Sequence, residues 1–272
     1  MLKYRFIIKI LFIIIICIFF FILFQSNNNI KKLKENFSQK KIAISFGGGG
    51  ENYINSVNRI HSELSDLNIF DLIIKYTDTE LKKDEIFWKK NSEFILENNR
   101  GYGYWLWKPY IILKTLNTMD NGDILLYLDS GCEIIADEES SEKMSNLLDK
   151  CNNNELLYTL TNQTEKKYNK MDLLKYMDMD NNNIKNSEQN QATIIFIKKT
   201  DKTYNLIEEW YTIACNYHFI DDSISIEQND SSFIEHRHDQ SIFSLLTKKY
   251  SFNNNENKLY DFSPIHISRK RT

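Results

Sequence analysis

The sequence predicts an α/β fold in which a mainly parallel sheet carries helices on both faces. Short apolar runs typical of buried strands alternate along the chain with longer segments whose apolar residues recur at helical spacing. The run from Ile124 to Leu128 is the clearest strand, because it is short, strongly apolar and ends abruptly at Asp129. Alternation of strands and helices favours a parallel sheet, and such sheets bind ligands over the carboxyl ends of their strands.

The same patterns place the elements along the chain. We expect strands at residues 41–46, 70–76, 124–128, 156–160 and 192–197. We expect helices at residues 51–67, 84–98, 109–119, 139–150, 201–214 and 240–249, with Asp201 and Asp239 as N-caps of the last two. Residues 162–190 are polar and rich in asparagine, so we expect a long mobile loop there.

The N-terminal residues predict a membrane anchor. The segment Phe6–Phe24 is apolar except for one lysine and meets the length of roughly 17–25 residues that a spanning helix needs. A cleaved signal peptide is the alternative, but the polar residues that follow Phe24 make a poor cleavage site. The sequence thus predicts an anchor at residues 1–26, a polar stalk at 27–41 and one domain at 42–272.

The expected location of the protein follows from the anchor. Lysines flank both ends of the apolar segment, so the positive-inside rule does not decide its orientation. A short tail before a single span usually stays cytoplasmic, so we expect a type II membrane protein whose domain is lumenal, as in the Golgi or ER, or otherwise extracytoplasmic.

The net charge of the chain is −3, so it lacks the basic surface of nucleic-acid binders. This excludes a nucleic-acid partner.

The cysteines outside the anchor are Cys132, Cys151 and Cys215. Their number is odd and their spacing fits no zinc pattern. One disulfide in a lumenal compartment is an open alternative. We expect three ordinary small side chains in the core, because free cysteine behaves as a small hydrophobe.

The acid at the end of the central strand is the first candidate for chemistry. An unpaired charge next to a core costs several kcal/mol, so Asp129 needs a partner such as a metal ion or a sugar hydroxyl. The alternative is that Asp129 only opens an Asx turn. The glycines at residues 47–50 follow the first strand and allow either a close backbone approach to a nucleotide or a surface turn.

A second candidate is the segment RGYGYWLWKPY at residues 100–110. Tyr102 and Trp105 can stack on a base, and Arg100 and Lys108 can hold a diphosphate. Lys108 precedes Pro109 at the expected start of a helix, where free amides and the helix dipole already favour anions. The alternative is that the tryptophans are core residues and Lys108 is solvated.

Two further candidates lie near the C-terminus. The segment HRHDQ at residues 236–240 is not a zinc motif, and its carboxylate, Asp239, can orient an acceptor hydroxyl or act as a general base. His266 lies in a short apolar stretch and Lys270 in the basic tail that follows. Next to a diphosphate site both are candidates, and elsewhere they are structural or solvated.

The ordered set of RGYGYWLWKPY, GDILLYLDSGCE and HRHDQS resembles a group of nucleotide-sugar glycosyltransferases of the GT-A type, over about residues 42–270. The resemblance implies a GT-A-like, Rossmann-like domain. It implies that Asp129 is the first acid of a D-x-D motif that binds a divalent metal, Mn or Mg, with the donor diphosphate. The second acid of that motif is replaced by Gly131.

The resemblance also implies roles for the other candidates. Lys108 matches the donor-binding cation, and Asp239 with Gln240 matches a pair near the donor sugar and the acceptor. His266 matches a late metal ligand, and Lys270 lies where the family places a cation near phosphate.

The expected function is therefore transfer of a sugar from a nucleotide-diphosphate sugar to a hydroxyl on a glycan, protein or lipid, by a hexosyltransferase-like enzyme. Asp129 and Asp239 are the catalytic candidates. The missing second acid leaves open a noncatalytic sugar- or nucleotide-binding protein of the same fold. A glycoside hydrolase that uses Asp129 and Asp239 as paired carboxylates is the third alternative.

Overall fold

The computed structural model describes residues 39–135 and 137–270. They form one compact unit that begins at Lys40. The expected membrane anchor at residues 1–26 and most of the expected stalk lie outside the described residues. Within the described ranges, no helix is both long and apolar enough to cross a bilayer.

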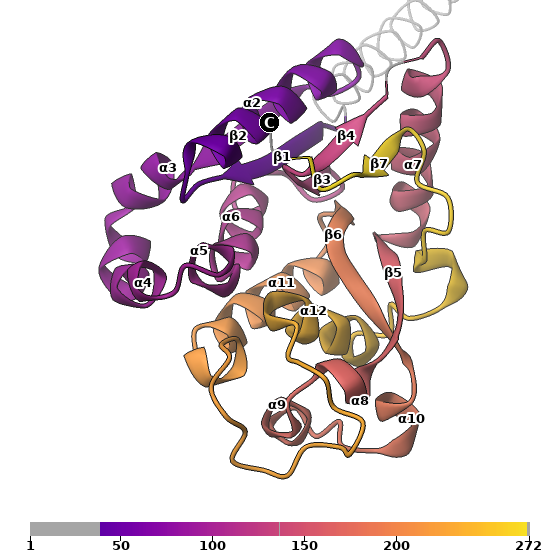
Figure 1. Cartoon of the computed structure of the whole chain (residues 1–272). Helices are drawn as coiled ribbons and strands as arrows, with labels where there is room; N and C mark the ends of the chain where they lie inside the picture. The colour runs from indigo at the N-terminus through magenta and orange to yellow at the C-terminus, as the bar shows by residue number, and fades with distance from the viewer. Residues whose placement is uncertain (1–38, 136, 271–272) are drawn as a thin grey trace, which may run out of the picture. The chain divides into compact units, whose positions relative to one another are not determined.

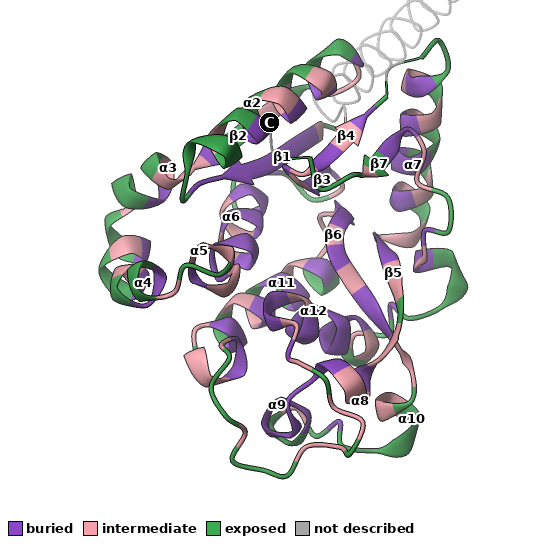
Figure 2. Cartoon of the chain, in the orientation of Figure 1, coloured by how far each residue is buried: buried purple, intermediate pink, exposed green. Residues whose placement is uncertain are grey.

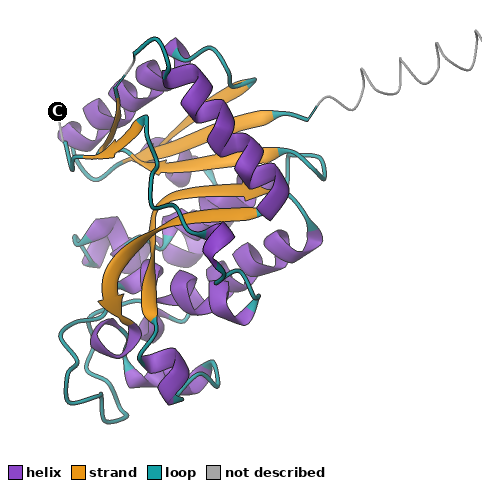
Figure 3. Cartoon of the chain, turned by 90° about the vertical axis from the view of Figure 1, so that its right-hand side faces the viewer, coloured by secondary structure: helices purple, strands orange, loops and turns teal. Residues whose placement is uncertain are grey.

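A five-stranded mixed sheet forms the centre of the unit, in the order β2-β1-β3-β6-β5 (Figures 1 and 3). The strands are β1 (Lys41–Gly47), β2 (Leu72–Thr77), β3 (Ile124–Asp129), β5 (Leu156–Thr164) and β6 (Glu188–Lys198). β1 pairs in parallel with β2 and β3, whereas β6 pairs antiparallel with both β3 and β5. Four strands therefore run the same way, which confirms the mostly parallel sheet, and the reversed β6 was not predicted.

Helices cover both faces of the sheet, as expected. One face packs against α2 (Glu51–Asp66) and α7 (Ser140–Asn154). The other packs against α4 (Glu85–Glu97), α6 (Trp107–Leu116), α11 (Asp201–Ala214) and α12 (His238–Lys249). The alternation of side chains along β3 explains this, since Leu125 and Tyr127 enter one core and Leu126 and Leu128 the other. Figure 2 shows the buried residues along the strands.

The helix starts differ from the prediction in ways that matter for the site. Thr200, and not Asp201, caps α11 with its side chain. Arg237 occupies the N-cap of α12, so Asp239 lies inside the first turn of that helix and is not its cap. Two short helices, α3 (Asp78–Lys83) and α5 (Gly101–Tyr104), were not predicted.

The prediction of a mobile loop at residues 162–190 is wrong. β5 and β6 extend into this segment from both ends, and α8 (Glu165–Tyr168), α9 (Met171–Tyr176) and α10 (Asn182–Lys185) fill the rest. Five apolar side chains there are buried: Tyr168, Met171, Leu173, Leu174 and Met179. The many asparagines masked these few residues, which are enough to fix the segment against the core.

A two-stranded antiparallel sheet brings the end of the described chain next to β3. It consists of β4 (Cys132–Ile134) and β7 (Ile265–Ile267). Cys132, Cys151 and Cys215 are free thiols. Cys132 and Cys151 are buried in the core as expected, whereas Cys215 is only partly buried.

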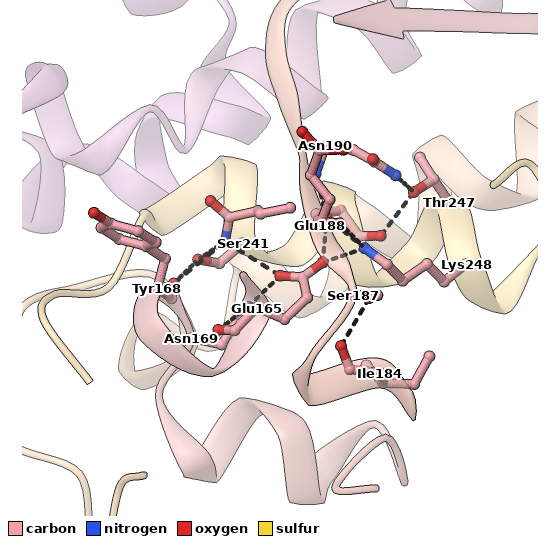
Figure 4. Close-up of polar contacts among 12 residues, drawn as sticks. Glu165, Tyr168, Asn169, Ile184, Ser187, Glu188, Asn190, Ser241, Thr247 and Lys248 are labelled. Carbon is pink, nitrogen blue, oxygen red and sulfur yellow. Dashed lines mark hydrogen bonds and ion pairs between the residues drawn. The ribbon is translucent and has the colours of Figure 1, made fainter. Parts of the chain in front are cut away.

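A buried polar cluster anchors α12 to the sheet (Figure 4). Glu165 of α8 is fully buried and contacts both Lys248 Nζ and Ser244 Oγ of α12. The Lys248 ammonium also donates to Glu188 O of β6 at 2.9 Å. Because an unpaired buried charge is costly, these contacts hold the last turn of α12 in a fixed place.

Replacing Lys248 by methionine is expected to destabilise the protein by about 3–5 kcal/mol, because Glu165 then remains buried without its cation. Lys249→Met is the matched control. Lys249 lies on the same helix and pairs with Glu209, but its side chain is 48% exposed, so the expected loss is below about 1 kcal/mol. Urea unfolding measures both, and equal losses would contradict the role given to Glu165.

Candidate functional site

A cavity of about 770 Å³ lies over the carboxyl ends of β1 and β3. Its lining comes from the glycines after β1, from α5, from the first turns of α6 and α12, from β6 and from the C-terminal segment. Seven of the residues singled out in the sequence line it: Arg100, Tyr102, Trp105, Lys108, Asp129, Asp239 and Gln240. These segments are far apart in the sequence, so the fold is what assembles the site.

Lys108 joins the two candidate carboxylates. Its ammonium lies 3.2 Å from Asp129 Oδ1 and 2.8 Å from Asp239 Oδ2, and it donates to Ala192 O at 3.1 Å. The residue is only 3% exposed, so it is neither the solvated lysine of the alternative interpretation nor a surface cation. The ammonium therefore contacts three elements: carboxylates on β3 and α12, and a backbone carbonyl on β6.

The charges of this trio determine its protonation. Burial by itself would lower the pKa of Lys108, but the charges of Asp129 and Asp239 outweigh it and hold that pKa above its ordinary value. Burial raises the pKa of Asp239 to about 6, against the opposing effect of Lys108. Tyr127 donates its hydroxyl to Asp129 Oδ1 at 2.6 Å, and burial followed by the Asp129 charge keeps the pKa of Tyr127 well above its usual range.

The reversed strand β6 explains how residues from the middle of the chain reach the cavity. Since β6 runs opposite to β3, its amino half lies at the edge where β3 ends. Gln191 and Thr193 of that half line the cavity, although the sequence reasoning did not select them. In a parallel sheet the start of a strand lies at the edge away from the ligand, so there was no reason in the sequence to place Gln191 and Thr193 at the site.

The aromatic wall is built on an unusual backbone. Tyr102, Gly103 and Trp105 have φ values of 52°, 83° and 60°, in the left-handed region that non-glycine residues avoid. A Cβ on Gly49 would lie 2.8 Å from the Tyr102 ring, so a glycine is required opposite this tyrosine. Trp107 stacks on Phe46 at 3.9 Å and is a core residue, whereas Tyr102 and Trp105 keep partly exposed faces at the cavity.

Arg100 lies at the cavity but is already engaged. Its guanidinium pairs with Asp222 at 3.1 Å and with Glu235 at 3.3 Å. Arg237 also pairs with Glu235, at 2.9 Å, and lies over the Tyr168 ring. These arginines therefore tie α5 to the loop before α12.

Two sequence candidates lie outside the cavity lining. Lys270 Nζ pairs with Glu133 at 2.6 Å, and His266 is exposed on β7 opposite Glu133. The cavity lining contains neither of them. Across residues 39–135 and 137–270 no group of three or more acids, histidines or cysteines is placed to hold a metal. The expected binding of a metal by Asp129 and His266 stays a prediction.

The C-terminal segment contributes a different cation. Arg269 lines the cavity, and no carboxylate in the described part of the chain pairs with it. Its φ of 56° is again left-handed. The basic run after β7 was a signal for this position, but in the sequence Lys270 and Arg269 could not be distinguished.

The two histidines that flank Arg237 support the loop before α12. His236 Nδ1 accepts a hydrogen bond from Lys170 N, and its Nε2 donates to Phe219 O. His238 Nδ1 donates to Ile220 O at 2.7 Å. Burial lowers the pKa of His236 to about 3 and that of His238 to about 4. Both rings are neutral near pH 7, so they add no charge to the cavity.

No protein-family model and no curated protein matches the sequence. Among solved structures, the chain is similar to mouse xyloside xylosyltransferase 1, with a TM-score of 0.42 and 10% identity over 78% of this chain and 82% of that one. It is also similar to the galactosyltransferase LgtC (TM-score 0.36, 12% identity, 85% and 82%) and to a glycosyltransferase involved in the glycosylation of the major capsid of PBCV-1 (0.34, 9%, 63% and 65%). These scores are low, and we assign no function to the chain from them.

Replacing Lys108 by methionine is expected to cost more stability near pH 8 than near pH 5. Without the ammonium, the buried Asp239 keeps its proton to a higher pH, whereas an aspartate of the unfolded chain ionises near pH 4. A group whose folded pKa is raised loses stability as the pH rises. We expect a loss of about 3–5 kcal/mol near pH 8 in urea unfolding.

Lys114→Met is the matched control on the same helix. Lys114 pairs with Asp84 but is 41% exposed, so a small loss that is equal at both pH values is expected. A pH-independent loss for Lys108→Met would contradict the charge arrangement described above.

Proposed function

We propose that this chain is a glycosyltransferase of the GT-A type that moves a sugar from a nucleotide-diphosphate sugar to a hydroxyl acceptor on a glycan, protein or lipid. The observation that carries the proposal is the pair Asp129 and Asp239, held on one buried lysine at the floor of the cavity. A carboxylate with a raised pKa next to a charged partner is typical of a reaction centre.

The charge of the cavity suits an anionic donor. Its lining carries four cations, Arg100, Lys108, Arg237 and Arg269, and two carboxylates, Asp129 and Asp239. The lining residues by themselves are therefore net positive, although the chain as a whole is net negative. Arg100 and Arg237 are paired with Asp222 and Glu235, which are not part of the lining, so Lys108 and Arg269 are the cations that no such acid neutralises. Cationic side chains in a partly enclosed site stabilise the charge that develops on a leaving diphosphate.

The aromatic wall and the glycines suit the nucleoside. Tyr102 and Trp105 offer ring faces to a base, and Gly48 and Gly49 allow the backbone to lie close to the ligand. The Asp129 Oδ1 atom takes both the ion pair with Lys108 and the hydrogen bond from the Tyr127 hydroxyl. The Asp129 side chain is 32% exposed. Its other oxygen is therefore available to a hydroxyl of the donor sugar.

Asp239 is the proposed general base. In the transfer, the acceptor oxygen bonds to the anomeric carbon, the bond from that carbon to the diphosphate oxygen breaks, and the hydroxyl proton passes to the Asp239 carboxylate. Lys108 stabilises that carboxylate before the step, and Gln240 lies beside it on α12 at the cavity. The Gln240 side chain is fixed by a hydrogen bond in which its Nε2 donates to Gln189 Oε1 at 2.8 Å.

We also propose that residues 1–26 anchor the enzyme in a membrane as a type II protein with a lumenal or extracytoplasmic domain. The support is the apolar segment Phe6–Phe24 and its poor cleavage site. Carbonate extraction and protease protection of the expressed full chain test the two parts of this proposal. Release into the soluble fraction, or digestion of the domain in intact vesicles with a cytoplasmic face outward, would reject it.

A panel of nucleotide sugars tests the function. Thermal unfolding of the full chain is measured with each compound, and release of nucleoside diphosphate is measured with and without acceptor mixtures. Ligand at about 100 times its Kd adds about 2.7 kcal/mol to stability. Stabilisation with turnover supports the transferase, stabilisation without turnover supports a noncatalytic binding protein, and glycoside cleavage without any nucleotide effect supports a hydrolase.

Replacing Asp239 by asparagine is expected to reduce turnover by about 10²–10⁴-fold, since the amide cannot accept the proton. In the unmodified enzyme, turnover is expected to fall as the pH drops through about 6, because the carboxylate form of Asp239 is lost there. The rate measured from pH 5 to pH 8 gives both results. Asp201→Asn, at an exposed aspartate of α11, is the control and keeps full turnover.

A further inference from the structure

We propose that the donor diphosphate is held by side-chain cations, with Arg269 in contact with it and Lys108 beneath it, and that no divalent metal takes part in its binding. This inference rests on the proposed transferase function. It departs from what the D-x-D resemblance implies, and three features of the described residues carry it.

The first feature is that the space between the acids is already filled by a cation. Lys108 Nζ lies within 3.2 Å of both Asp129 and Asp239, and the ammonium is buried. A metal ion on Asp129 would lie close to this ammonium in a site of low dielectric, where like charges repel strongly. Lys108 offsets one of the two carboxylate charges that would attract the metal.

The second feature is that the structure leaves little room for a second acid. A Cβ on Gly131 would lie 3.3 Å from Arg269 Cα, which is backbone and cannot turn aside. The C-terminal segment is fixed in this place, since Lys270 N and Ser268 Oγ both donate to Gly131 O at 3.1 Å. A side chain at position 131 would therefore require this segment to shift by a few tenths of an ångström, which a glycine avoids.

The third feature is that the same segment brings a cation to the cavity. Arg269 adopts a left-handed backbone between Ser268 and Lys270, lines the cavity and has no carboxylate partner within the described residues. By contrast, Arg100 and Arg237 are paired with acids of the loop before α12. An unpaired arginine is suited to a diphosphate, because its planar fork matches two phosphate oxygens.

Together, the three features replace a metal ion by side-chain cations. A D-x-D site would hold a metal between two acids. This site instead holds Lys108 on Asp129, and the C-terminal segment lies close to Gly131 and adds Arg269 to the cavity lining. The positive charge for the leaving group then comes from residues of the chain itself. Metal and side-chain cations are alternative sources of the same stabilisation.

The test is calorimetric titration of the full chain with UDP, GDP, ADP and CDP, first after treatment with EDTA and then with MnCl₂ added. The expected result is that at least one nucleoside diphosphate binds after EDTA, with a Kd that manganese changes by less than about threefold. Binding that appears only with manganese would overturn the inference and leave the proposed function standing. Absence of binding under both conditions would overturn both.

Variants separate the roles of the cations in the same titration. Arg269→Gln is expected to weaken binding by about tenfold or more, and Arg269→Lys, which keeps the charge, by less. Lys270→Gln is the contrast, because its ammonium is paired with Glu133 outside the cavity lining, and a change below about twofold is expected. Equal binding by Arg269→Gln and the unmodified chain would reject the role of Arg269.

Discussion

The buried ammonium of Lys108 is the interaction on which the arrangement of the cavity depends. Taking a charge out of water costs several kcal/mol unless its partners are in place, so β3, α12 and β6 must come together for the lysine to be satisfied. The ion is therefore both part of the core and part of the floor of the site. The contacts that satisfy the buried lysine are therefore also the contacts that bring the candidate site residues together.

The mixed sheet determines what surrounds that ion. Parallel β1 and β3 deliver their carboxyl ends, with the glycines and Asp129, to one edge. The reversed β6 delivers its amino half to the same edge, and α12 packs along it. The antiparallel pair of β4 and β7 brings the C-terminal segment next to the end of β3. The cavity thus combines residues from both ends of the domain, and none of these segments forms it alone.

Much of the fold was predictable because its signals are local. Apolar runs and helical periodicity located the strands and long helices, and the acid-ended strand pointed to Asp129. The signals failed where tertiary contacts decide. Five buried apolar residues order the asparagine-rich segment, and the direction of β6 has no local signature. Lys270 pairs with Glu133, which lies 137 positions earlier in the sequence, so no local pattern predicts the pair. Arg269 could not be separated from its neighbours for the same reason.

The buried cluster around Glu165 has a mechanical consequence. It fixes the last turn of α12, while the Lys108 ion pair fixes the first, so the helix that carries Asp239 is clamped at both ends. The cavity lining also includes short segments: the glycine loop, α5 and the residues after β7. The candidate site is therefore preorganised, because the fold sets the position of Asp239 before any ligand arrives.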